Sequence, residues 1–176
     1  MRTSLVLTVI GDDKPGIVEQ LSDRILATGA NWEESRMARL AGKFAGVLRV
    51  SVEEQQADRL AAELRALGAG GLTVVVERGA RPTQPPAQTL QLDVVGNDHP
   101  GIVRDISRVL AQHQVNIEHL ETEVTSAPMS GDALFHARAT GRGPGPIATD
   151  RLRAVLEALA GELMVDLTFG ERETRT

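Results

Sequence analysis

Two loops of this chain combine a carboxylate with the start of a helix. The segments GDDKPG from Gly11 and GNDHPG from Gly96 share an aspartate followed two residues later by Pro-Gly, and Ile-Val comes next in both. Proline fits the first helical turn, where its missing N–H is not needed, and the free N–H groups of that turn attract an anion. Asp13 and Asp98 would repel an anion but attract an ammonium group. Each loop is therefore expected to hold the zwitterionic head group of an α-amino acid rather than a phosphate.

An asparagine follows each loop where the chain re-enters the predicted sheet. A side-chain amide both donates and accepts hydrogen bonds, so it can bridge the carboxylate and the ammonium of one ligand. The alternative is a turn residue on a plain strand-to-helix connection. Two copies that share aspartate and asparagine favour the ligand interpretation. The candidate binding residues are Asp13, Lys14, Gly16, Ile17 and Asn31 in the first copy and Asp98, His99, Gly101, Ile102 and Asn116 in the second.

The two loops differ at one charged position, which is Lys14 in the first copy and His99 in the second. A fixed cation and a titratable imidazole predict unequal sites, with His99 able to change ligand binding near neutral pH. The alternative is a solvated surface side chain, and for Lys14 we favour it.

A third set of polar residues lies on a predicted strand. His119, Glu121 and Glu123 alternate and so point to the same face of the sheet. Such a set can hold a divalent metal or act as an acid–base pair, but a solvated strand face has the same pattern, and that is the interpretation we favour. No glycine-flanked nucleophile motif occurs in the sequence. We therefore expect no catalytic residue, no metal site and no cofactor.

The elements that position these residues follow from the spacing of apolar side chains, which predicts the order β-α-β-β-α-β twice. In the first copy the expected elements are a strand at 5–10, a helix from Ile17 through Leu26, strands at 32–40 and 44–52, a helix at 53–67 and a strand at 72–76. In the second copy they are a strand at 90–95, a helix from Ile102 through Leu110, strands at 116–124 and 133–139, a helix through 152–159 and a strand at 163–169. Both copies are thus predicted to be ferredoxin-like βαββαβ units, an α+β fold with antiparallel sheets and helices on one face.

The repeat also predicts the domain organisation. We expect a first module at 1–78 and a second at 89–170. The segment GARPTQPPAQ at 79–88 contains three prolines, which favour an extended, semi-rigid linker. The charged residues 171–176 have no apolar anchor and are expected to form a flexible tail.

Composition excludes several classes of protein. The 176 residues include no cysteine, which excludes disulfides and zinc–thiolate sites and is typical of a cytoplasmic protein. A net charge of −5 without a basic cluster argues against direct binding of nucleic acid, because affinity for phosphates comes from Lys and Arg. No apolar run approaches the roughly 20 residues that span a membrane, so we expect a soluble protein with no membrane partner.

The D-x-P-G loop within tandem βαββαβ units resembles the ACT domain, a ferredoxin-like module that senses small molecules. The resemblance covers nearly the whole chain. In ACT domains the effector commonly lies between paired modules, where the first loop and the start of the second strand contact it. Those positions are occupied here by Asp13, Lys14, Gly16 and Asn31, and by Asp98, His99, Gly101 and Asn116.

What the resemblance implies is a non-catalytic regulatory protein. It is expected to bind a small amino acid, with glycine and serine as candidates, and to act on transcription through a protein partner such as a transcriptional activator. Formation of a homodimer is also expected. A regulatory subunit of a metabolic enzyme would use the same ligand chemistry with a different partner. A small enzyme on a ferredoxin-like fold is the third hypothesis, and it predicts titratable groups with perturbed pKa values gathered in a pocket.

Overall fold

The computed structural model describes residues 1–79, 88–127, 131–143 and 149–172. Contacts divide the chain into two compact units, 1–82 and 83–176. Within the described residues each unit has four strands and two α-helices in the order βαββαβ, which confirms the predicted ferredoxin-like fold. The predicted linker falls mostly on residues 80–87, which lie outside the described part of the chain.

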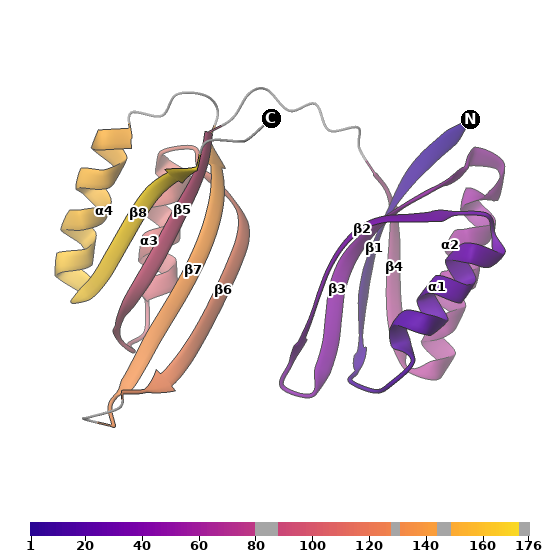
Figure 1. The fold of residues 1–176 in the computed structure, drawn as a ribbon, viewed down its shortest axis with the longest axis horizontal. Helices are drawn as coiled ribbons and strands as arrows, with labels where there is room; N and C mark the ends of the chain where they lie inside the picture. Colours follow the sequence, from indigo (N-terminus) through magenta and orange to yellow (C-terminus); the bar gives the residue numbers. More distant parts are fainter. Residues whose placement is uncertain (80–87, 128–130, 144–148, 173–176) are drawn as a thin grey trace. The chain divides into compact units, whose positions relative to one another are not determined.

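The first unit is an antiparallel sheet with two helices on one face (Figure 1). Its strand order is β2-β3-β1-β4. The helix predicted at 53–67 is an α-helix flanked by short 3-10 turns at Glu54–Gln56 and Ala66–Gly70. The elements are β1 (Arg2–Asp12), α1 (Ile17–Ala27), β2 (Asn31–Leu40), β3 (Lys43–Glu53), α2 (Ala57–Arg65) and β4 (Leu72–Arg78).

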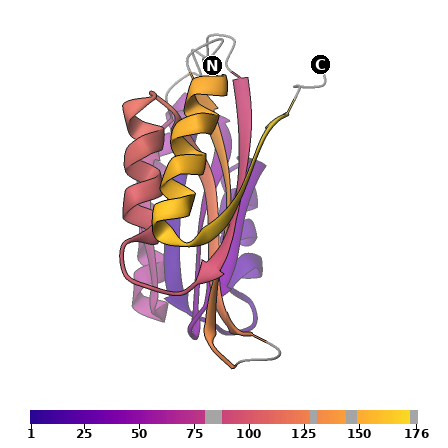
Figure 2. The ribbon, with the colours of Figure 1, turned by 90° about the vertical axis from the view of Figure 1, so that its left-hand side faces the viewer.

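The second unit repeats this arrangement with the strand order β6-β7-β5-β8. Figure 2 shows its two helices side by side over the same face of the sheet. The elements are β5 (Gln88–Asn97), α3 (Ile102–Gln112), β6 (Asn116–Ser126), β7 (Ala133–Gly143), α4 (Thr149–Leu163) and β8 (Val165–Arg172). None of the helices in the described segments is long and apolar enough to cross a membrane.

In each unit the core lies between the sheet and its helices, because alternate strand residues point to the same face. In the first unit, Leu7 and Val9 of β1 and Leu21 of α1 are fully buried. Val18 and Leu26 belonged to the predicted apolar face of α1, but their side chains are 48% and 75% exposed. The contact face of α1 follows a four-residue spacing and is narrower than the sequence pattern predicted.

The boundaries of the last strand differ from the prediction. Leu163, predicted as its first residue, ends helix α4 instead, and β8 begins at Val165. Met164 between them has a positive φ of 53°, which turns the chain from helix to strand. At its other end β8 continues to Arg172, two residues into the predicted tail, and Arg172 is paired with Thr89 of β5. Residues 173–176 are not among those described.

The repeated glycine at the end of the first strand of each unit has a structural reason. A Cβ on Gly96 would lie 2.6 Å from Val165 Cγ1 and 2.8 Å from Val165 Cα. A Cβ on Gly11 would lie 3.0 Å from the oxygen of Gly71. The close approach of the last strand, not a ligand, therefore explains this glycine in both copies.

Candidate functional site

Each predicted binding loop ends at a glycine that caps the following helix. Gly16 and Gly101 are the N-cap residues of α1 and α3, with φ values of 92° and 106°. Such positive φ values favour glycine because it has no Cβ. Neither cap provides a side-chain hydrogen bond, so the N–H groups of the first turn point out of the helix end. Pro15 precedes the cap and lies outside the first turn, which corrects the predicted position of the proline.

Ile17 and Ile102 begin the two helices, and their side chains are core residues with 4% and 2% exposure. Only their main-chain N–H groups are available to a ligand at the loop. The sequence singled out these positions for their N–H groups, and the burial of the side chains agrees with that role.

The two aspartates have different surroundings. Asp13 Oδ2 lies 2.6 Å from Arg39 Nε on β2. Asp98 forms no ion pair within the described part of the chain, because Val124 occupies the position in β6 that Arg39 occupies in β2. That correspondence follows from the register, in which Arg39 pairs with Phe44 and Val124 with the matching Phe135. A carboxylate free to receive an ammonium group is thus found in the second loop and not in the first.

Lys14 and His99 make equivalent contacts within their own units. Lys14 Nζ donates to the oxygen of Gly70, at 2.9 Å, and His99 Nε2 lies 3.0 Å from the oxygen of Leu163. Both acceptors stand two residues before the last strand of their unit. Each side chain therefore ties the first loop to the segment just before the last strand, which is the 3-10 turn after α2 in the first unit and the end of α4 in the second.

Contacts with two carbonyl groups raise the pKa of His99 above its ordinary value. The larger cause is the Leu163 oxygen, and the second is the Pro100 oxygen, 3.2 Å from Nδ1. Only an imidazolium can donate from both ring nitrogens at once. Asp98 and Asp105 add a smaller electrostatic effect in the same direction.

A charged pair lies on the first turn of α3, close to Gly101. Arg104 donates two hydrogen bonds to the carboxylate of Asp105, at 2.8 and 3.1 Å. The guanidinium lowers the pKa of Asp105, whose side chain is 21% exposed. A Cβ on Gly101 would lie 3.4 Å from Asp105 Oδ2 and 3.5 Å from Arg104 Nη2, so both members of this pair are close to the helix end and balance each other's charge there.

The two asparagines open the second strand of their units. Asn31 is the first residue of β2 and Asn116 the first of β6, and both are exposed. The strand register sets them level with Ser4 and Thr89, at the start of the first strand of each unit, whereas the aspartates follow the end of that strand. Within one module the structure therefore does not bring the asparagine and the loop together, contrary to the prediction.

The glutamate two residues after the asparagine sits at a β-bulge in each copy and pairs with an arginine of the neighbouring strand. The distances are 3.4 Å from Glu33 Oε2 to Arg49 Nε and 2.9 Å from Glu118 Oε1 to Arg142 Nε. The repeated glutamate thus has a structural role at the strand entrance.

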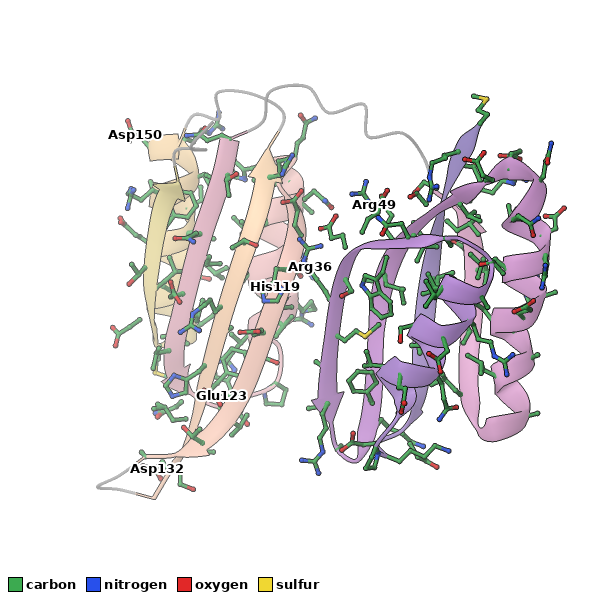
Figure 3. All side chains as sticks on the ribbon, turned by 45° about the vertical axis from the view of Figure 1, so that its right-hand side comes forward. Arg36, Arg49, His119, Glu123, Asp132 and Asp150 are labelled. Atoms are coloured by element: carbon green, nitrogen blue, oxygen red, sulfur yellow. The ribbon has the colours of Figure 1, made fainter. Side chains whose placement is uncertain are left out.

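The third set of polar residues lies on the face of the second sheet that carries no helix. His119 and Glu123 point away from the helices in Figure 3, and His119 Nε2 is 3.3 Å from Glu121 Oε1. No group of three His, Asp or Glu side chains suited to a metal ion occurs in the described segments. All three residues of this set are exposed.

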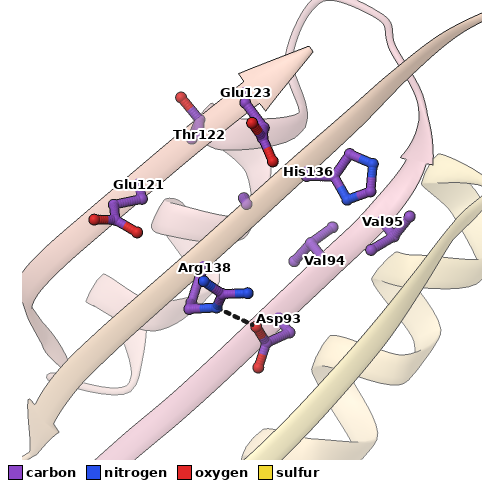
Figure 4. Close-up of a pocket in the computed structure, with 9 residues that line it drawn as sticks. Asp93, Val94, Val95, Glu121, Thr122, Glu123, His136 and Arg138 are labelled. Atoms are coloured by element: carbon purple, nitrogen blue, oxygen red, sulfur yellow. Dashed lines mark hydrogen bonds and ion pairs between the residues drawn. The ribbon is translucent and has the colours of Figure 1, made fainter. Parts of the chain in front are cut away.

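A shallow hollow of about 350 Å³ lies on the same open face (Figure 4). Glu121 stands opposite Arg138, and Glu123 stands opposite His136, in the register of β6 and β7. Arg138 in turn donates to Asp93 Oδ1 at 3.1 Å. Three carboxylates and one guanidinium line this hollow, so these cross-strand neighbours leave an excess of negative charge on the open face.

Sequence reasoning did not identify Arg39, Arg104 or Val124 as residues that set the charge at the loops. Arg104 and Asp105 could have been identified from the sequence, because an Arg-Asp pair in the first turn of a predicted helix lies beside the N-terminus of that helix. Arg39 lies far from Asp13 in sequence, and only the fold-back of β2 brings the two side chains together. The difference in ion pairing between Asp13 and Asp98 was therefore not predictable from the repeat itself.

Comparison with known proteins gives two matches to one family. Residues 3–77 and residues 91–157 each match a family model described as ACT domain. Over 163 residues the chain is 28% identical to the glycine cleavage system transcriptional repressor of Escherichia coli (strain K12), which covers 90% of this chain and 85% of that protein.

Two solved structures align with almost the whole chain. A crystal structure described as an unknown protein from Galdieria sulphuraria is 31% identical, with a TM-score of 0.88 and coverage of 98% of this chain and 100% of that one. A protein assigned provisionally as a glycine cleavage system transcriptional repressor is 23% identical, with a TM-score of 0.74 and 99% of both chains covered. At 23% identity, the similarity to this second structure shows a shared fold and nothing more.

Proposed function

Because the chain belongs to the ACT domain family, with two modules in tandem, we propose that it is a non-catalytic regulatory protein that binds a small amino acid. The observation that carries the ligand assignment is the contrast between Asp98 and Asp13. Asp98 is the carboxylate that the described residues leave without an ion pair, whereas Arg39 already neutralises Asp13. The second module is therefore the binding module.

The chemistry of the second loop matches a zwitterion. The N–H groups at the start of α3 attract the ligand carboxylate, and the Asp98 carboxylate attracts its ammonium group. Asn116 is level with Thr89 at the start of β5, and Asp98 follows the end of β5, so this asparagine does not belong to the same site. Glycine and serine are the first candidates, since the similar protein of Escherichia coli is named for the glycine cleavage system.

The protein acts by binding another protein. The likeness to a transcriptional repressor supports a role in transcription, and the net charge of −5 argues against direct contact with DNA. The partner is accordingly a protein such as a transcriptional activator, and both act in the cytoplasm. Ligand binding favours one conformation of the protein over another and so changes the population that presents the partner surface. We include a homodimer in this proposal, because two copies of the chain can change conformation together when the ligand binds.

Isothermal titration of the full chain with glycine, serine and the other amino acids tests this function. Asp98→Asn should weaken binding about tenfold or more, because a charge-assisted hydrogen bond contributes about 1.5–3 kcal/mol. Asp13→Asn and Asn31→Ala are the matched controls in the first module, and Asn116→Ala is a control at the other end of the second sheet. All three should leave binding unchanged. An absence of binding by every amino acid at millimolar concentration would refute the sensor function, and loss of binding in the first-module variants alone would assign the site to the other loop.

A further inference from the structure

The first module carries apolar side chains on the face of its sheet that no helix covers. Across the four strands, the residues level with Thr8 and those level with Ile10 form the two central rows of this face. Three apolar side chains of these rows reach the surface, with exposed fractions of 47% for Ile10, 45% for Val47 and 49% for Val75. Together with two alanines level with Ile10, they form what we call the apolar patch: Ile10, Ala38, Ala45, Val47 and Val75.

Charged residues occupy most of the matching positions of the second sheet. In the repeat, Thr8 matches Asp93. Through the strand register, Val47 then matches Arg138. The two central rows of the first sheet contain Arg36 as their one charged residue, whereas those of the second contain five: Asp93, Glu121, Glu123, Arg138 and Asp166. The shared fold therefore does not require apolar residues at these positions, and the apolar patch has another reason.

Ion pairs surround the apolar patch. On one side of it, Arg36 Nη1 lies 3.0 Å from Glu34 Oε1, and on the other side Lys43 pairs with Asp12. Arg36 and Arg49 point away from the helices of their module in Figure 3. An apolar centre within a charged rim is the usual organisation of a protein interface. The face has no net charge, because it carries three basic and three acidic residues: Arg36, Lys43, Arg49, Asp12, Glu34 and Glu77.

This charge balance favours a second copy of the chain as the partner. The chain has a net charge of −5, so two copies associate most readily through a surface that itself carries no net charge. The helix-free face of the first sheet has that property, whereas the same face of the second sheet has four acidic residues and one basic residue in its central rows. A neutral face gives a strongly basic or acidic partner no electrostatic advantage. Against itself, it brings apolar side chains together and meets no excess of like charge.

We propose that the chain forms a homodimer in which the helix-free faces of two first modules stack on each other around the apolar patch. The inference rests on the homodimer included in the proposed function, and it names the surface. Two sheets pack face to face about 10 Å apart, with the apolar side chains of both filling the space between them. The contact is isologous, because the same patch is buried in both copies. The acidic face of the second module stays in contact with water.

Sedimentation equilibrium of the full chain tests the interface. The unmodified chain should be a dimer, and Val47→Arg, which introduces the residue of the second module, should raise the Kd of the dimer about tenfold or more. The reason is that an isologous contact would bury two guanidinium groups without partners. Val18→Arg is the matched control, because Val18 is 48% exposed on α1 and lies outside this face. Thermal unfolding of each variant establishes that it is folded. A monomeric unmodified chain, or a dimer that Val47→Arg leaves intact, would overturn the proposal.

Thiol labelling provides a second measurement that introduces no charge. The chain has no cysteine, so Val47→Cys and Val18→Cys each carry a single thiol. The rate of reaction with a maleimide should fall for Val47→Cys as the protein concentration rises through the Kd of the dimer, and it should stay constant for Val18→Cys. Rates that do not change with concentration in either variant would contradict burial of this face.

The dimer and the sensor function fail in different ways. Amino-acid binding by a chain that stays monomeric would refute the dimer and leave the sensor function standing. A dimer that Val47→Arg dissociates, in a protein that binds no amino acid, would support the interface and refute the sensor function.

Discussion

His99 Nε2 lies 3.0 Å from the main-chain oxygen of Leu163, which ties the candidate binding loop of the second module to the end of its last helix. The first module makes the same connection with an ammonium group, from Lys14 to Gly70. The repeat thus retains the contact and changes only whether its donor titrates near neutral pH. Lys14, which we expected to be a plain surface residue, has this structural role as well.

The contact predicts a pH dependence of stability. The pKa of His99 is raised in the folded protein, so protonation favours folding. The stabilisation is fully present below the ordinary histidine pKa of about 6.5 and is lost as the pH rises through the folded value. An NMR titration of the His99 ring should give a pKa above 6.5. His99→Lys should keep the donor and remove this part of the pH dependence of thermal unfolding, and an unchanged dependence would show that the contact does not form.

A backbone position next to this contact predicts a stabilising substitution. Met164 has a φ of 53° and a side chain that is 76% exposed, whereas the matching Gly71 has a φ of 85°. Met164→Gly should raise the free energy of unfolding by about 0.5–1 kcal/mol, because it relieves a left-handed conformation and loses little buried surface. Gly71→Ala should lower it by a similar amount. Urea denaturation measures both, and a loss of stability in Met164→Gly would contradict the strain argument.

The close approach of β8 to Gly96 predicts a destabilising substitution. A Cβ there would lie 2.8 Å from Val165 Cα, so the strand must shift, and Gly96→Ala should cost about 1–3 kcal/mol. Gly161→Ala is the control, because a Cβ at that position on α4 meets nothing within 4 Å. It should gain about 0.5–1 kcal/mol from helix propensity. Urea denaturation of both variants measures the change in the free energy of unfolding, which should be negative for Gly96→Ala and positive for Gly161→Ala.

The free Asp98 predicts that ligand binding can be suppressed from the neighbouring strand. Val124→Arg places in β6 the residue that holds Asp13 in the first module, and the exposed position of Val124 tolerates the change. The new guanidinium should compete with the ligand ammonium and weaken amino-acid binding about fivefold or more. Val124→Gln, which has similar length without the charge, is the control in the same titration. Equal affinity of both variants would indicate that Asp98 does not contact the ligand.

The architecture was largely predictable, because it depends on local patterns. The spacing of apolar residues along strands and helices, together with the repeated loop, predicted two βαββαβ units, and the structure has both. The helix starts at Gly16 and Gly101 followed from Pro-Gly before an apolar run. The boundary at Leu163 was missed, because an apolar residue at the end of a helix has the same appearance as the first residue of a strand.

The sequence by itself determined that the chain is a tandem repeat with an aspartate, a glycine cap and an asparagine in each copy, since these are properties of single positions and their spacing. The difference between Lys14 and His99 already predicted unequal sites, but only the tertiary structure decided which aspartate is neutralised. Arg39 reaches Asp13 because β2 folds back beside the loop, and Arg138 matches Val47 only through strand register. Charge neutralisation and the matching of positions across a sheet depend on distances between residues far apart in the chain, which the spacing of a repeat does not contain.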